Sequence, residues 1–103
     1  FEVRGKGSVD ETGPRLDCNA DGGVLVCDTK VADIRPGTWV HVEIAFTIGS
    51  GEFSLLLKYD GGELNKSFPF LHAHFRSVSW AGITAGLIND GSAYFDNLKM
   101  SIE

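Results

Sequence analysis

Residues 38–48 read Thr-Trp-Val-His-Val-Glu-Ile-Ala-Phe-Thr-Ile, and this stretch decides the class of fold. Apolar residues occupy every second position, which is the side-chain period of a β-strand. We therefore expect one face of the strand to lie in a core and the other face to carry mixed side chains. The core face is Val40, Val42, Ile44, Phe46 and Ile48, and the opposite face is Trp39, His41, Glu43, Ala45 and Thr47.

Turn residues place this strand in a hairpin. Gly49-Ser50-Gly51 follows it, and residues 52–59 alternate again before Asp60-Gly61-Gly62. Two alternating runs joined by a short glycine-rich connection are typical of two antiparallel strands. Residues 15–18 and 24–28 flank a second such connection, at residues 19–23, and predict a second hairpin.

The rest of the chain reads as further short strands and loops. We expect a strand at residues 1–4, a loop at 5–14, a brief edge strand at 30–34, an edge or packed loop at 68–71, and strands at 75–85 and 92–102. No segment shows a clear apolar repeat of 3.6 residues. The sequence therefore predicts an all-β protein, an antiparallel two-sheet sandwich, with a closed barrel as the lesser alternative.

Length and charge restrict the classes of protein further. The 103 residues fit a single β-sandwich domain, or the C-terminal part of one. Nine basic residues against fourteen acidic ones give a net charge of −5, and the basic residues are scattered. Because nucleic acids and anionic membranes are themselves negative, we expect neither as a partner.

The mixed face of residues 38–48 holds the best candidates for ligand binding. Trp39, His41 and Glu43 combine an aromatic ring with hydrogen-bonding groups, a combination that stacks a sugar ring and orients its hydroxyls. The alternative for Trp39 is a structural role at the end of the core, since large aromatic side chains are usually buried. Trp80 is open to the same two interpretations.

Asp96 is the candidate metal ligand, because it falls on the more apolar face of the expected last strand, where an unpaired carboxylate is costly to bury. Its partner would be backbone donors or Arg, or a calcium ion. Cys18 and Cys27 flank the second predicted turn, and a cross-strand disulfide or two reduced thiols both fit that spacing. The histidines lack Cys partners at zinc-like spacing, so we expect His72 and His74 to be structural or surface residues.

Catalytic chemistry has little support in the sequence. Hydrolysis of a glycosidic bond normally requires two carboxylates on either side of the bond, and Glu43 stands alone on its strand. The chain also lacks a G-x-S-x-G nucleophile elbow and a phosphate-binding P-loop. We therefore lean against an enzyme without deciding the question.

Several short motifs resemble the concanavalin A-like, laminin-G-like jelly-roll domains of secreted bacterial proteins. They are Gly13-Pro14-Arg15-Leu16, the turn Asp21-Gly22-Gly23, and the runs at residues 35–44, 75–82 and 93–99. The resemblance implies a carbohydrate-binding module, with Asp96 of the closing Tyr-Phe-Asp-Asn run at a structural calcium. It also implies that the chain corresponds to the C-terminal half of such a domain.

Half a sandwich would leave an apolar face and strand edges uncovered. The chain opens on Phe1 without an initiator Met, and we expect a processed or excised piece. The cover would then be the missing half as a separate chain, self-association, or a rearranged sandwich made from these strands alone.

The leading functional hypothesis is a non-catalytic carbohydrate-binding or accessory module of a secreted bacterial protein, with Trp39, His41, Glu43 and Trp80 contacting a glycan. One alternative is a fragment of a glycoside hydrolase or polysaccharide lyase whose catalytic acids lie elsewhere. Another is a structural or adhesive module that has no sugar site.

Overall fold

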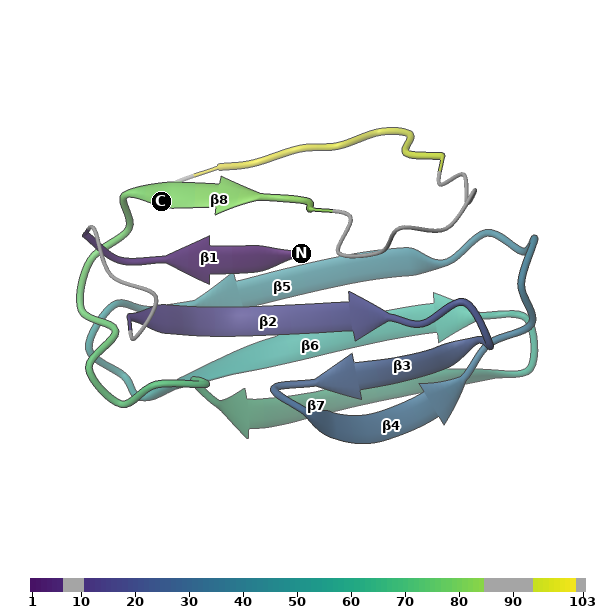
Figure 1. Ribbon diagram of the computed structural model, residues 1–103, viewed down its shortest axis with the longest axis horizontal. Helices are drawn as coiled ribbons and strands as arrows, with labels where there is room; N and C mark the ends of the chain where they lie inside the picture. The colour runs from purple at the N-terminus through teal and green to yellow at the C-terminus, as the bar shows by residue number, and fades with distance from the viewer. Residues whose placement is uncertain (7–10, 85–93, 102–103) are drawn as a thin grey trace.

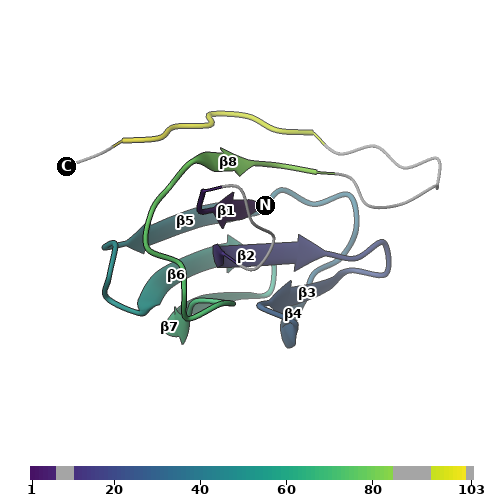
Figure 2. The same cartoon turned by 60° about the vertical axis from the view of Figure 1, so that its left-hand side comes forward.

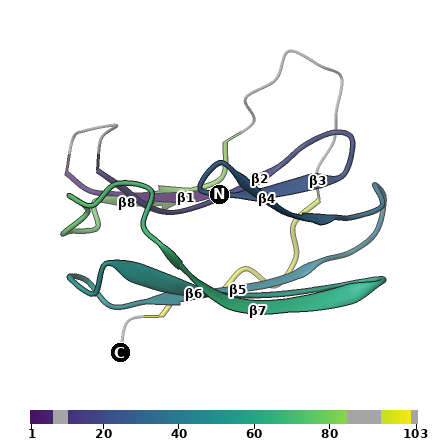
Figure 3. The same cartoon turned by 90° about the horizontal axis from the view of Figure 1, so that it is seen from below.

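The computed structural model describes residues 1–6, 11–84 and 94–101. In this part of the chain two antiparallel sheets pack against each other, as Figures 1 and 3 show. The strands are β1 (Glu2–Arg4), β2 (Thr12–Cys18), β3 (Gly23–Val26), β4 (Thr29–Asp33), β5 (His41–Phe46), β6 (Glu52–Tyr59), β7 (Gly62–Pro69) and β8 (Trp80–Gly82). The predicted all-β class and two-sheet arrangement are confirmed.

The two sheets differ in width. One has five strands in the order β4-β3-β2-β1-β8, and the other has three in the order β5-β6-β7. The free edges of β8 and β5 lie on the same side of the sandwich, and residues 94–101 run along that side in Figures 1 and 2. The described strands thus supply both layers of the sandwich.

The hairpin of β5 and β6 follows the sequence prediction closely. The strands pair in one continuous register from His41 opposite Lys58 to Phe46 opposite Phe53. Gly49 and Gly51 adopt positive φ angles of 86° and 82° in the connection, a conformation that glycine takes without steric cost. The two-residue alternation of residues 38–48 therefore does report a strand, although the paired part is shorter than expected.

The second predicted hairpin also forms, as β2 and β3, but β2 begins earlier than expected. Residues 12–14, which were expected to be loop, belong to β2 because their backbone is paired. The carbonyls of Thr12 and Gly13 accept hydrogen bonds from the amides of His72 and Leu71, at 2.9 and 3.1 Å. Residues 12–14 have a composition typical of a loop, but hydrogen bonds from residues about sixty positions later in the chain hold them in a strand.

The predicted strand at residues 24–28 ends early, at Val26. Cys27 and Asp28 take φ angles of 46° and 69°, and they form the two-residue turn between β3 and β4. Two successive positive φ angles are the signature of a type I′ hairpin turn, which matches the twist of the flanking strands. The edge strand expected near residues 30–34 is confirmed as β4.

Two predictions for the second half of the chain are wrong. Of the expected strand at residues 75–85, the described part pairs only in β8, because residues 70–79 carry the chain from the smaller sheet to the larger one. The expected last strand at 92–102 is not formed in its described part, residues 94–101, which is extended but unpaired and exposed. The structure also pairs residues 62–69 as a full strand, β7, where the sequence predicted only an edge or packed loop at 68–71.

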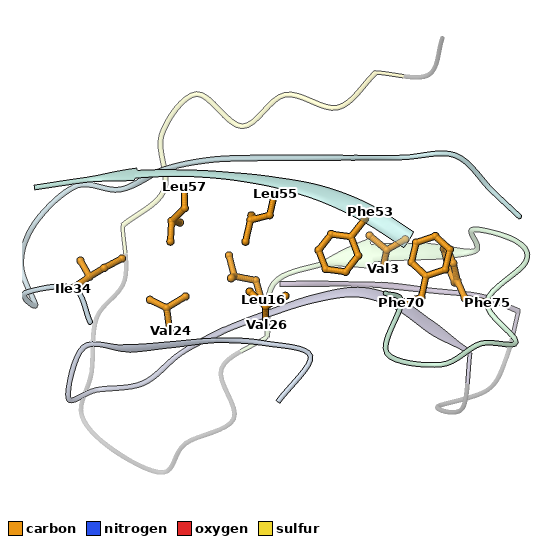
Figure 4. Packing of buried hydrophobic residues seen from close by; sticks show 10 residues of the cluster. All are labelled: Val3, Leu16, Val24, Val26, Ile34, Phe53, Leu55, Leu57, Phe70 and Phe75. Atoms are coloured by element: carbon orange, nitrogen blue, oxygen red, sulfur yellow. The ribbon is translucent and has the colours of Figure 1, made fainter. Parts of the chain in front are cut away.

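One apolar core lies between the sheets, as Figure 4 shows. Leu55 of β6, with 0% of its surface exposed, lies at the centre and faces Leu16 and Val26 of the larger sheet. At one end Phe70 and Phe75 pack edge to face, with ring centroids 4.9 Å apart. The Phe75 ring also covers Gly13, where an added Cβ would come within 2.5 Å of it.

None of the described residues forms a helix long and apolar enough to span a membrane.

We expect Leu55→Ala to lower the free energy of unfolding by about 2–5 kcal/mol, because it leaves a cavity in a close-packed core. Urea denaturation followed by circular dichroism measures this loss. Leu56→Ala is the matched control, since Leu56 is next in the strand but lies on the opposite, partly exposed face. Equal losses in the two variants would contradict the burial of Leu55 in the core.

Candidate functional site

The outer face of the three-stranded sheet presents polar side chains in cross-strand rows. One row is His41, Lys58 and Glu63, the next is Glu43, Leu56 and Asn65, and the third is Ala45, Ser54 and Ser67. All of these residues except Leu56 are exposed. Side chains directly opposite each other on paired strands stand about 5 Å apart. The face can therefore offer donors and acceptors together over three strands.

His41 and Glu43 are brought together on this face, as their spacing in the sequence predicted. His41 Nε2 lies 3.6 Å from Glu43 Oε1, and the two side chains are 59% and 61% exposed. An ion pair at such an exposed position contributes little to stability. Both side chains can thus contact a ligand or a partner with little loss of folding stability.

Trp39 is 68% exposed, so the structural role considered for it in the core is not observed. The physical reason is that Ile34 closes that end of the core, beside Leu57 and Val24 in Figure 4. Trp39 lies two residues before β5, after Gly37, which has a φ angle of 83°. An indole exposed to this degree is available to stack on a planar or ring-shaped ligand.

Trp80 lies on the other sheet and is not brought to His41 and Glu43. It pairs with Arg4 in the β1–β8 ladder, and the Arg4 guanidinium carbon is 5.1 Å from the centre of its ring. Arg4 also donates to Glu2, and this hydrogen bond lowers the pKa of the Glu2 carboxyl. Trp80 is therefore engaged in a cation–π contact on the outer face of the five-stranded sheet.

Asp96 is exposed in the unpaired segment 94–101. A calcium ion takes six to eight oxygen ligands in proteins. Among the described residues, no group of three or more Asp, Glu, His or Cys side chains could hold a metal ion. Within the described residues no such cluster supports a calcium ion at Asp96, and a site there stays a prediction from the resemblance.

Sequence reasoning missed the members of the polar face on β6 and β7, namely Ser54, Lys58, Glu63, Asn65 and Ser67. Glu63 and Asn65 belong to β7, whose alternation is broken by Lys66 on the inward-facing side, opposite Leu55. Lys58 was recognised as a strand residue, but only the register shows that it lies beside His41. Leu64 and Phe68 are apolar, four positions apart and on the inward-facing side, and this spacing was the signal that could have indicated β7.

Glu43 has no carboxylate beside it in its row, where its neighbours are Leu56 and Asn65. The other candidate histidine with a defined contact is His72, whose Nδ1 accepts a hydrogen bond from the Thr12 amide at 3.1 Å. This contact ties the connection after β7 to the start of β2, which is a structural role.

Cys18 and Cys27 are both free thiols. The β2–β3 register places Cys18 opposite Val24, and the Cys27 amide donates to the Arg15 carbonyl. The two cysteines are thus offset by three residues along the strands, or about 10 Å, which exceeds the Cα separation that a disulfide spans. The cross-strand disulfide considered from the sequence does not form in this register.

Comparisons with protein-family models, with curated proteins and with solved structures find no match to this chain. The fold class and the polar face are therefore supported by the structure of this chain alone.

We expect iodoacetamide to alkylate Cys18 before Cys27. Burial raises the pKa of both thiols, so the order follows from solvent access: Cys18 is exposed, whereas Cys27 is half-buried. Intact mass and peptide mapping of the unreduced protein at mildly alkaline pH measure the order of modification, with Cys18→Ser and Cys27→Ser as controls. Recovery of an unreactive chain with the oxidised mass would contradict both the free thiols and the register.

Proposed function

We propose that the chain is a non-catalytic carbohydrate-binding or accessory module of a secreted bacterial protein, and that it binds glycan on the outer face of β5, β6 and β7. The observation that carries this proposal is an exposed sheet face with polar groups in register, with the exposed Trp39 two residues before β5 in the chain. Hydrogen-bonding groups and an accessible aromatic ring are the two elements that sugar recognition requires.

Each residue has a distinct part in the proposed site. Trp39 stacks on the apolar face of a sugar ring. Glu43 accepts hydrogen bonds from sugar hydroxyls, and His41 and Asn65 each offer both a donor and an acceptor. Because the sheet is held by a core that these side chains do not enter, binding needs no rearrangement of the fold. Trp80 lies on the opposite sheet and is not included in this site.

The finer fold assignment is part of the same proposal. Two antiparallel sheets packed on one core are consistent with a jelly roll of the concanavalin A-like kind, and the short motifs at residues 35–44 and 93–99 support that assignment. Such modules are commonly secreted, and this is the localisation we propose.

We expect Trp39→Ala to weaken retention on the bound polysaccharide by about three- to tenfold, the loss that corresponds to one aromatic stacking contact. Affinity gel electrophoresis across a panel of plant, algal and bacterial polysaccharides provides the measurement. Trp80→Ala is the matched control, since it removes the chain's other Trp from the opposite sheet and should leave retention unchanged.

Thermal melting of both variants separates binding from folding. Because Trp39 is exposed, its replacement should leave the melting temperature nearly unchanged. Absence of retention by the unmodified protein on every polysaccharide would reject the proposal in favour of a structural or adhesive module.

A further inference from the structure

The two sheets have four edge strands in the described part of the chain, namely β4, β8, β5 and β7. A free strand edge exposes unpaired amides and carbonyls, and proteins protect such edges with Pro, Lys, bulges, inward-pointing charges or very short strands. Comparing the four edges shows which of them is open to another strand.

Three of the edges carry protection. In β7, Pro69 lacks an amide donor, and Lys66 places a charge on the inward-facing side. The pairing of β4 shifts register between Val24 and Leu25, and its exposed side carries an ion pair of Lys30 with Asp33, at 2.7 Å. β8 has only three residues.

β5 carries none of these devices. Its six residues contain no Pro, Lys or Arg, and they pair with β6 without a register shift. Val42 lies on the same face as the buried Leu57, yet it is 41% exposed because none of the described strands lies beyond it. A groove of about 950 Å³ follows the second half of this edge, along residues 44–48. Of the described residues that line it, only Val78 and Ser101 come after β7 in the sequence.

We propose that β5 pairs antiparallel with β5 of a second copy of this chain, about a two-fold axis at Val42. The smaller sheets of the two copies then form one continuous sheet of six strands. The contact is isologous, which is the commonest arrangement of homodimers.

The charges on β5 favour this register over the one centred on Glu43. With Val42 opposite Val42 of the second copy, His41 lies opposite the second copy's Glu43, and the same pair repeats across the axis. An imidazole N–H donates to a carboxylate whether the ring is neutral or charged. Shifting the axis to Glu43 would place two carboxylates face to face, which is unfavourable.

Side-chain sizes fit the same register. On the inner face, Val40, in the residues that lead into β5, lies opposite Ile44 of the second copy, so that half-buried apolar groups of the two chains cover one another. On the outer face, Trp39 lies opposite the second copy's Ala45, whose small side chain leaves room for the indole. Ser101 lines the same groove as Ile44 and Ala45, so it lies beside the outer pairs of this contact.

Sedimentation velocity as a function of concentration, without any glycan, tests the proposal independently of sugar binding. We expect the unmodified protein to form a dimer with a dissociation constant below about 100 µM. Val42→Lys puts two ammonium groups at the axis and should raise the dimer dissociation constant at least about tenfold. Val42→Thr, which keeps the β-branched shape, serves as the control.

A charge exchange tests the register itself. Glu43→Lys alone should weaken the dimer about tenfold, and His41→Glu alone should weaken it similarly by opposing two carboxylates. The double variant carrying both changes recreates an opposite-charge pair across the axis, and we expect its dissociation constant to return to within about threefold of the original. Glu63→Lys, on the protected edge β7, is the matched control and should leave dimerisation unchanged.

Thermal melting confirms that each variant is folded, and the exposed positions 41 and 43 keep the test valid if Val42→Lys fails to fold. A chain that stays monomeric throughout the concentration range overturns the proposal, since the edge is then covered by residues 94–101 or by a different chain. A dimer that is unaffected by Val42→Lys and by the single charge reversals overturns it equally.

Discussion

The packing of β6 against the larger sheet is the interaction on which the rest of the structure depends. Phe53, Leu55 and Leu57 project from one face of β6 and are almost completely buried. Among the described strands of its sheet, β6 alone has a neighbour on both sides. Removing this face from water fixes the register of β5 and β7, and that register in turn aligns the polar rows on the outer face.

The unequal width of the sheets explains where the molecule is open. Three strands cannot cover five, so the larger sheet extends beyond β5 on the β8 side. Val42 of β5, which would be buried in a central strand, is consequently exposed, and Ile44 and Phe46 are only partly buried. β5 thus belongs to both the polar face and the open edge. A ligand bound on that face would therefore lie next to whatever pairs with the edge of β5.

Much of the fold could be predicted from local sequence. The hairpin of β5 and β6 was predictable because its alternation is uninterrupted and its turn is rich in glycine. β7 was not predicted in full, since Lys66 on its inward-facing side breaks the pattern. The start of β2 could not be predicted, because its hydrogen bonds come from Leu71 and His72, far away in the sequence.

The candidate site divides in the same way. His41 and Glu43 share a face for a reason internal to one strand, and the alternation alone predicted it. The exposure of Trp39 depends on Ile34 filling the end of the core, and the separation of Trp80 depends on which sheet β8 joins. Both are consequences of long-range packing, which a single sequence does not display.

The connection from β7 to β8 shows a further consequence of such packing. Although residues 70–75 lie outside any strand, the Leu71 and His72 amides donate to β2 carbonyls, and Phe70 and Phe75 are buried beside them. Exchange of these amide hydrogens with solvent requires the β2 contacts to separate. The segment that crosses between the sheets is thus bonded to β2 and packed in the core, so separating the two layers requires these contacts to break as well.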